Sequence, residues 1–169
     1  MTPSAWLSFE ARFKAVIDTS NYADYSHKMS QTNVQFSVAS HIMASLAAHP
    51  GQPVRSSDLA SSVNADPSFV RRVISKLAKA GLVSTTRGKM GACVLSRPAS
   101  EITLLDIYQA SEAPRTFVVH QYAVTECCHV SRNIKGCLEN ILQRAQASFE
   151  QSLAQQTLAD ISHALESDR

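Results

Sequence analysis

The sequence predicts a mainly helical fold with one small β-hairpin, on three observations. Apolar residues recur every three or four positions in several segments, and the longest of these patterns spans residues 131–155. Two β-favouring runs, 82–85 and 93–96, flank a loop that contains two glycines, as a hairpin needs. The chain has 169 residues, of which 44% are hydrophobic, enough to bury a core. The sequence therefore indicates one domain, or one domain with a long appendage.

Composition and simple signals exclude several classes of protein. A charged fraction of 18%, six prolines and five glycines exclude a wholly disordered or collagenous chain. No apolar run approaches the roughly 20 residues of a membrane-spanning helix, and residues 1–28 lack the apolar core of a secretory signal. No glycine-rich phosphate loop or nucleophile elbow occurs, so we expect no enzyme and no catalytic residues. We expect a cytoplasmic protein whose four cysteines stay reduced.

Two helices are expected before residue 65. Apolar residues at helical spacing predict the first over residues 33–48, and the turn at Pro50-Gly51 ends it. The second is short, lies within residues 54–64, and is expected to be capped by Ser56 or Ser57.

A third helix is predicted over residues 67–80. Asp66 suits its N-cap, Pro67 its first helical position, and Gly81 the position just after it. Its apolar side chains fall on one face, and its serines, arginines and lysines fall largely on the other.

The charge of the chain is unevenly distributed around this helix. Between Arg55 and Arg97 there are eight basic and two acidic residues, a net charge of +6, whereas the remainder of the chain carries −4. A basic module on an acidic body indicates an anionic partner for that module.

In order, these elements are two helices, a tight turn, a basic helix and a hairpin with a basic tip. This order is typical of a winged helix-turn-helix, in which a cationic helix enters the major groove of DNA. A flexible basic wing can reach the neighbouring backbone or minor groove. The sequence therefore favours double-stranded DNA as the partner.

The C-terminal half predicts three more helices. A short helix is expected over residues 103–112, followed by a loop over 113–131 that contains the adjacent Cys127 and Cys128. The long helix over 131–155 has an apolar stripe across about six turns, and Thr157 is expected to cap a last helix.

Six runs of residues stand out in the chain: SSDLA at 56–60, DPSFVRRVI at 66–74, LAKAGLV at 77–83, RGKMGACVLSRP at 87–98, EITLLDIYQA at 101–110 and TLADI at 157–161. In this order they resemble the Rrf-two (BadM) family of bacterial winged-helix transcription regulators, across about residues 30–165. One departure lies in the wing, where Gly91-Ala92-Cys93 stands in place of two adjacent glycines and an aromatic residue.

The resemblance implies a homodimeric regulator, usually a repressor, that binds a near-palindromic operator. The long helix would cross its counterpart in the dimer, and its apolar stripe supports that role independently. By position, the predicted DNA-binding residues are Ser68, Arg71, Arg72, Ser75 and Lys76 in the third helix, with Arg87 and Lys89 in the wing.

The cysteines suggest how such a regulator could sense a signal. Cluster-binding members of the family carry three spaced cysteines before the long helix, whereas here Cys127 and Cys128 are adjacent and Cys137 follows. His120, Glu126 or His129 could replace the missing ligand of an iron–sulfur cluster. The run from Cys128 to Ile134 is more similar to the cluster-free branch, which retains one cysteine.

On that match we expect redox sensing by Cys128, with Cys127 beside it, and neither a cofactor nor a metal. A thiol next to a helix start and to Arg132 is favoured as thiolate, so its oxidation could release DNA. The alternative is that Cys128 only packs at the dimer interface. Cys93 and Cys137 are expected in the core.

The predicted function is thus a homodimeric DNA-binding transcription regulator whose operator binding is modulated by cysteine oxidation or modification. Two alternatives stay open, an iron–sulfur-cluster-sensing regulator of the same fold and a thiol-dependent interaction protein that does not bind DNA. Residues 1–28, which the resemblance does not cover, are either a dispensable extension or a docked amphipathic helix. The expected organisation is an extension over 1–28, a winged helix-turn-helix DNA-binding domain over 29–112, a sensor loop over 113–131, and a dimerisation helix with a C-terminal helix over 132–169.

Overall fold

The structure, a computed structural model, describes residues 34–86, 91–113 and 115–167. A helix over residues 34–47, here called helix 34–47, opens the described part. The other elements, in chain order, are β1 (Val54–Arg55), α3 (Ser56–Val63), α4 (Pro67–Lys79), β2 (Val83–Thr85), β3 (Ala92–Leu95), the short 3-10 helix η1 (Ala99–Glu101), α5 (Leu104–Ala110), α6 (His129–Ala154) and α7 (Leu158–Ser167). The predicted fold class, mainly helical with a small β-hairpin wing and a long helix, is confirmed.

The sheet has three antiparallel strands in the order β1-β3-β2, one more than the sequence predicted. β2 and β3 form the expected hairpin, with Val83 opposite Leu95. β1 pairs with the other edge of β3, where Val54 lies opposite Cys93. A strand of two residues has too little pattern to be recognised locally, because its partner β3 lies almost forty residues further along the chain.

The prediction that Ser56 or Ser57 caps the second helix is wrong. The N-cap of α3 is Arg55, which makes no side-chain cap hydrogen bond, and neither Ser56 nor Ser57 occupies that position. The backbone N–H of Ser56 instead donates to the carbonyl of Gly91 at 3.1 Å. Strand β1 thus leads directly into α3, and the residue before β3 supplies an acceptor for the first N–H of the helix, which has no partner within the helix.

One hydrophobic core joins the helices to the sheet. Helix 34–47, the helices α3 to α7 and the strands β2 and β3 all contribute buried side chains to it, and dispersion and water exclusion both favour such packing. Its largest members include Ile42, Met43, Leu46, Leu59, Leu77, Leu82, Ile102, Ile107 and Leu158. α7 closes this core from the C-terminal end, where the N–H of Leu158 donates to the carbonyl of Ile102 at 2.8 Å.

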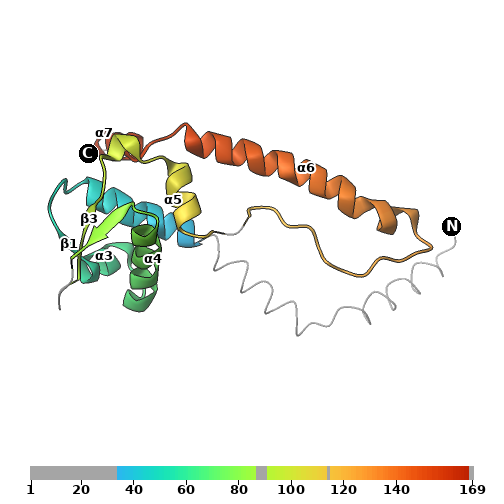
Figure 1. Cartoon of the computed structure of the whole chain (residues 1–169), viewed down its shortest axis with the longest axis horizontal. Coiled ribbons are helices and arrows are strands. Elements are labelled where there is room, and N and C mark those ends of the chain that lie inside the picture. The colour runs from blue at the N-terminus through green and yellow to red at the C-terminus, as the bar shows by residue number, and fades with distance from the viewer. Residues whose placement is uncertain (1–33, 87–90, 114, 168–169) are drawn as a thin grey trace.

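α6 extends away from this body (Figure 1). It has 26 residues, which correspond to about 39 Å at 1.5 Å per residue. It begins at His129, two residues before the predicted start. Gln146 and Leu153, near its C-terminal end, are its buried residues. No helix in the described ranges is both long and apolar enough to cross a membrane.

The segment over residues 115–128 connects α5 to α6 and runs beside α6, without helix or strand (Figure 1). Hydrogen bonds to α6 hold it there, among them Thr116 N–H to Gln146 Oε1 at 3.0 Å, Lys135 Nζ to Gln121 Oε1 at 3.0 Å, and Thr125 N–H to Ser131 Oγ at 2.8 Å. We call residues 115–128 the thiol segment, because Cys127 and Cys128 lie at its end.

Candidate nucleic-acid interface

The basic helix α4 starts at a fully formed cap. The Asp66 carboxylate accepts hydrogen bonds from the backbone N–H groups of Ser68 and Phe69, each at 3.0 Å, and from the Ser68 hydroxyl. These bonds, first that from the Ser68 hydroxyl and next that from Phe69, hold the pKa of Asp66 below its usual value. Pro67 occupies the first turn. The helix ends at Lys79, with Ala80 as its C-cap residue and Gly81 in the left-handed conformation at φ +73°. The predicted start and stop signals are therefore confirmed.

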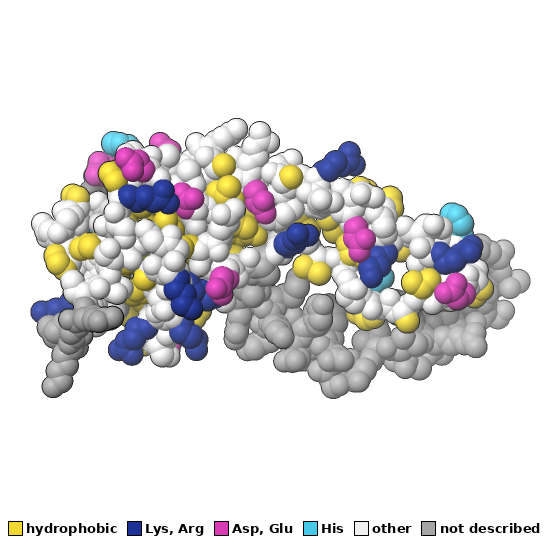
Figure 2. Space-filling view, in the orientation of Figure 1, with side chains coloured by type: hydrophobic (Ala, Val, Ile, Leu, Met, Phe, Trp, Pro, Cys, Tyr) yellow, Lys and Arg dark blue, Asp and Glu magenta, His cyan; other side chains and the backbone are white. Residues whose placement is uncertain are grey.

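Burial divides α4 into two faces. Val70, Val73, Ile74 and Leu77 are buried against the core, which leaves the opposite face for polar residues. Figure 2 shows Lys and Arg side chains gathered over the part of the body where α4 lies. The predicted residues that lie exposed on this face are Ser68, Arg71, Arg72 and Ser75.

Arg72 is partly held in place by its neighbours. Its guanidinium lies over the ring of Phe69, 5.8 Å from the ring centroid, a cation–π arrangement. Both residues border a groove of about 500 Å³ between α4 and helix 34–47, lined also by Val34, Gln35, Asp66, Val73 and Lys76. Arg71, by contrast, is exposed on the outer face of α4.

Lys76, also among the residues predicted to bind DNA, points toward helix 34–47. Its side chain is only 25% exposed, and its ammonium donates to Gln35 Oε1 on helix 34–47 at 2.8 Å. The helical pattern places Lys76 on the polar face, but a tertiary contact directs its charged end sideways, toward helix 34–47. No local pattern in the sequence predicts this contact, because the acceptor comes from a distant part of the chain.

The wing is described up to its tip. The N–H of Thr86 donates to the carbonyl of Ala92 at 2.9 Å and closes the hairpin at that point, whereas Arg87 and Lys89 lie outside the described residues. Cys93, in the position where the family pattern has an aromatic residue, is 1% exposed, and burial raises the pKa of its thiol. The prediction that Cys93 belongs to the core is confirmed.

Cys127 and Cys128 are both exposed at the end of the thiol segment. Cys128 is the N-cap residue of α6, and its N–H donates to the carbonyl of Thr125 at 3.0 Å. Its carbonyl accepts from the N–H of Arg132 at 3.2 Å, in the first turn of the helix. The thiol therefore lies at the positive end of a long helix, as the sequence indicated.

Cys137 does not lie in the core, contrary to expectation. It is exposed on the part of α6 that extends beyond the body. Across residues 34–86, 91–113 and 115–167, no three His, Cys, Asp or Glu side chains come together as a metal site. The thiols and histidines named from the sequence are therefore not brought together around one centre within this part of the chain.

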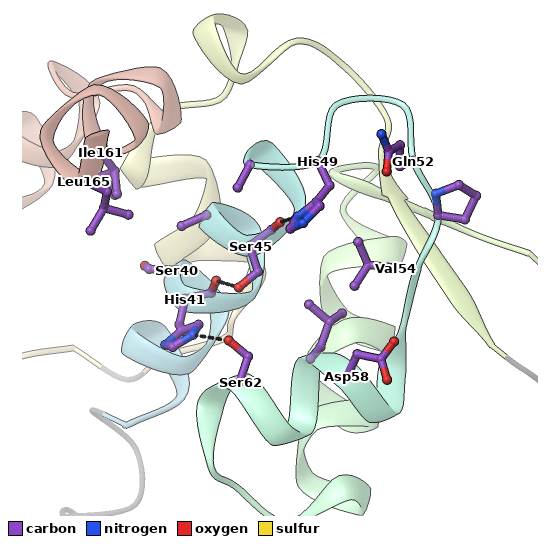
Figure 3. A pocket seen from close by; sticks show the side chains of 14 residues that line it. Ser40, His41, Ser45, His49, Gln52, Val54, Asp58, Ser62, Ile161 and Leu165 are labelled. Atoms are coloured by element: carbon purple, nitrogen blue, oxygen red, sulfur yellow. Dashed lines mark hydrogen bonds between the residues drawn. The ribbon is translucent and has the colours of Figure 1, made fainter. Parts of the chain in front are cut away.

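A larger cavity lies elsewhere, between helix 34–47, α3 and α7 (Figure 3). Its volume is about 810 Å³, and its lining includes neither the residues predicted to bind DNA nor any cysteine. On its wall, His41 Nε2 and the Ser62 hydroxyl are hydrogen-bonded at 3.0 Å, and His49 Nδ1 lies 2.9 Å from the carbonyl of Ser45.

Comparison with known proteins places the chain among transcriptional regulators. The family model Rrf2, described as an iron-dependent transcriptional regulator, matches residues 32–164. YwnA of Bacillus subtilis (strain 168), assigned as an HTH-type transcriptional regulator, is 32% identical over 130 residues, which cover 76% of this chain and 95% of YwnA.

Solved structures agree with this result. A crystal structure of a protein assigned as a transcriptional regulator from Lactobacillus plantarum has a TM-score of 0.69 and 27% identity, and the match covers 79% of this chain and 90% of that one. CymR, the global cysteine regulator of B. subtilis, has a TM-score of 0.57 and 25% identity, with 77% and 94% of the two chains covered.

Proposed function

Because the chain belongs to the Rrf2 family of transcriptional regulators, we propose that it is a homodimeric DNA-binding repressor whose operator binding responds to thiol oxidation. The observation that carries this proposal is the exposed basic face of α4, which a preformed cap presents at the surface of the winged-helix body. An α-helix of this kind fits the major groove, where base edges distinguish sequences.

The proposed base contacts come from α4. Arg71 is exposed and free to reach guanine O6 and N7, the most common specific contact of an arginine. Ser68, Arg72 and Ser75 lie on the same exposed face. Arg87 and Lys89 of the wing, which lie outside the described residues, are proposed to contact the neighbouring backbone or minor groove.

The proposed dimer forms through α6. Ile134, Leu138 and Leu142 follow one another at helical spacing and are only half-buried, while Ile141 is 46% exposed. Figure 2 shows further hydrophobic side chains along the half of the molecule that α6 and the thiol segment form. A second α6 packed on this face would remove these side chains from water, and two-fold symmetry would place two copies of α4 about one turn of DNA apart.

The proposed sensor is Cys128, with Cys127 as its neighbour. A peroxide would react with the Cys128 thiolate, so that the S–O bond forms, the O–O bond breaks, and sulfenic acid and hydroxide result. The exposure of Cys128 at the start of α6 supports this role, because an oxidant can reach its sulfur there. CymR, the cysteine regulator among the similar structures, also supports a cysteine-linked signal.

An iron centre is the second candidate, since the family model is described as iron-dependent. The donor set in the described residues does not fit such a centre within one chain, because the cysteines and histidines do not converge. No step of the proposed function therefore involves iron.

The test is DNA binding by the full chain. A duplex is selected by the full chain from a random-sequence pool, and its affinity is measured at several salt concentrations. Because binding neutralises phosphates, we expect affinity to fall steeply as the salt concentration rises. The salt slope, which is the steepness of the fall of log affinity with log salt concentration, should be about 0.9 for each phosphate contact. Failure to enrich any duplex, combined with thiol-dependent capture of another protein, would favour the interaction protein that does not bind DNA.

A further inference from the structure

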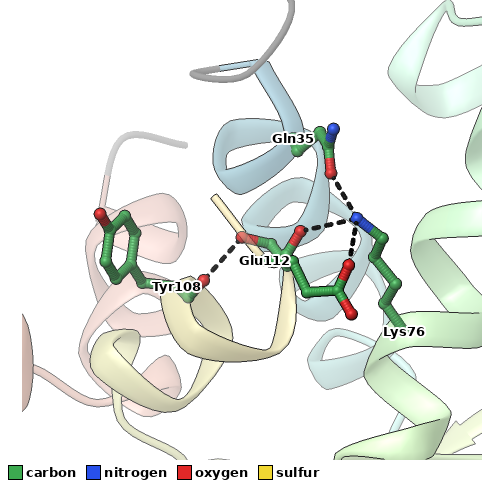
Figure 4. Close-up of polar contacts among 5 residues, drawn as sticks. Gln35, Lys76, Tyr108 and Glu112 are labelled. Atoms are coloured by element: carbon green, nitrogen blue, oxygen red, sulfur yellow. Dashed lines mark hydrogen bonds and ion pairs between the residues drawn. The ribbon is translucent and has the colours of Figure 1, made fainter. Parts of the chain in front are cut away.

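Lys76 joins three elements of the winged-helix body. Besides the hydrogen bond to Gln35, its ammonium donates to the carbonyl of Ser111 at 3.2 Å and forms an ion pair with Glu112 Oε2 at 3.0 Å. Figure 4 shows these acceptors converging on the end of the lysine side chain. An ammonium group has three N–H donors, and the three acceptors match that number.

The acceptors lie where α5 ends. Ser111 is the C-cap residue of α5 and is fully buried, and its hydroxyl donates to the carbonyl of Tyr108 at 2.7 Å. The last carbonyls of a helix have no partner within the helix and carry partial negative charge. Lys76 therefore supplies both a donor and a positive charge to this helix end.

Glu112 has an unusual backbone conformation for its residue type. Its φ is +52°, in the left-handed region that residues with a side chain disfavour. The ion pair with Lys76 and a hydrogen bond from its own N–H to the carbonyl of Gln109, at 3.1 Å, hold this conformation. The direction in which the chain leaves α5 is thus tied to a side chain of α4.

The same exit leads into the thiol segment. Four residues after Glu112, the N–H of Thr116 is bonded to Gln146 of α6 at 3.0 Å. Few residues separate Glu112 from Thr116, so a shift of one of them can be absorbed only to a small extent by the chain between them. The connection is therefore fastened to α4 at one end, through Lys76, and to α6 at the other.

We propose that Lys76 is a positioning residue that sets the orientation of α4 through the end of α5 and does not contact DNA. This inference rests on the proposed function, because the orientation of α4 matters only if α4 enters a groove. The salt dependence of DNA binding reflects the counterions that are released when lysine or arginine side chains neutralise phosphates. Replacement of a lysine that contacts no phosphate leaves that number unchanged. The affinity for DNA should therefore change while its salt dependence stays the same.

The experiment measures the affinity of the full chain for the selected duplex at several salt concentrations. Lys76→Met should weaken binding about tenfold, within the range known for residues that couple elements without touching the ligand, and leave the salt slope unchanged. Glu112→Gln should weaken binding less, also without altering the slope. The Glu112 side chain is 68% exposed, so this variant tests the proposal even where Lys76→Met does not fold.

Lys79→Met is the matched control, since Lys79 is exposed on the same helix. It should either lower the salt slope by about 0.9, as a phosphate contact does, or leave binding unchanged. A double variant of Lys76→Met and Glu112→Gln should bind no more weakly than Lys76→Met, because the carboxylate acts through the ammonium.

The proposal is overturned by a salt slope that falls in Lys76→Met as it does for a phosphate contact, or by unchanged affinity in both single variants. Additive losses in the double variant would also overturn it, because Glu112 would then act independently of Lys76. If the wild-type chain binds no duplex in a salt-dependent manner, the proposed function itself fails, and this outcome is distinct from the others.

Discussion

Gln146 of α6 donates a hydrogen bond to the hydroxyl of Tyr108 on α5, at 3.3 Å, in a buried position. The same amide group donates to Glu150 Oε1 at 2.8 Å, and its carbonyl oxygen accepts from Thr116. The Tyr108 ring packs edge-on against Phe36 and Phe149, with centroid distances of 5.6 and 5.4 Å. One polar residue thus fastens the long helix to the winged-helix body and to the thiol segment.

The first prediction concerns Gln146. Gln146→Leu should lower the free energy of unfolding by about 1–3 kcal/mol, because Tyr108, Glu150 and Thr116 each lose a hydrogen bond to the buried amide. Urea unfolding followed by circular dichroism measures this change. Gln143→Leu, on the same helix but exposed, is the control and should have little effect. Equal stabilities of the two variants would show that the contacts of Gln146 do not stabilise the attachment of α6.

The second prediction concerns Asp66 and pH. Since its pKa is lowered in the folded chain, its carboxylate stabilises the fold above the unfolded-state pKa, and this contribution is lost as pH falls through the folded-state pKa. Asp66→Asn keeps a capping side chain without the charge. The melting temperature of the wild type should exceed that of Asp66→Asn at about pH 7, and the difference should close below about pH 4.

Asp66→Ala provides the comparison for this experiment. It removes the cap as well as the charge, so its melting temperature should lie below that of Asp66→Asn across the whole pH range. A wild-type advantage over Asp66→Asn that is constant with pH would contradict the role assigned to the carboxylate.

The third prediction separates base contacts from backbone contacts. Arg71→Ala or Arg72→Ala should weaken binding to the selected duplex by about 1–3 kcal/mol and relax the sequence preference at one position. Arg87→Ala or Lys89→Ala should weaken binding to all sequences alike and lower the salt slope. Competition with mutated duplexes measures both effects, and unchanged affinity in all four variants would remove α4 and the wing from the interface.

The sequence predicted α4 well because its signals are local. Asp66, Pro67 and Gly81 fix its ends through their own conformational preferences. Its buried face follows from the 3.6-residue period alone. The exposed candidates on α4 could therefore be identified without knowledge of the remaining fold.

Other features depend on contacts that no local pattern contains. The orientation of Lys76 is decided by Gln35 and Ser111, which are 41 and 35 residues away. Cys137 lies on a helix with an apolar stripe, but only the course of α6 away from the body determines that this cysteine is exposed. Tertiary geometry, rather than periodicity, decides both cases.

The fourth prediction concerns the thiol at the start of α6. Peroxide treatment should weaken DNA binding by the wild type but not by Cys128→Ser, because the variant cannot form the sulfenic acid. Cys137→Ser, which removes another exposed thiol, is the control and should respond like the wild type. Affinity before and after treatment measures the response, and equal responses of wild type and Cys128→Ser would leave Cys128 without a sensing role.

The central claim, that α4 of a dimer reads the major groove, is tested most directly by methylation interference on the selected duplex. Guanine N7 lies in the major groove, so its methylation should abolish binding in two half-sites whose centres lie about 10 base pairs apart, one helical turn. Arg71→Ala should relieve this interference at one guanine of each half-site. The account would be contradicted if methylated guanines interfered with binding in only one half-site, or if guanine methylation left the affinity unchanged.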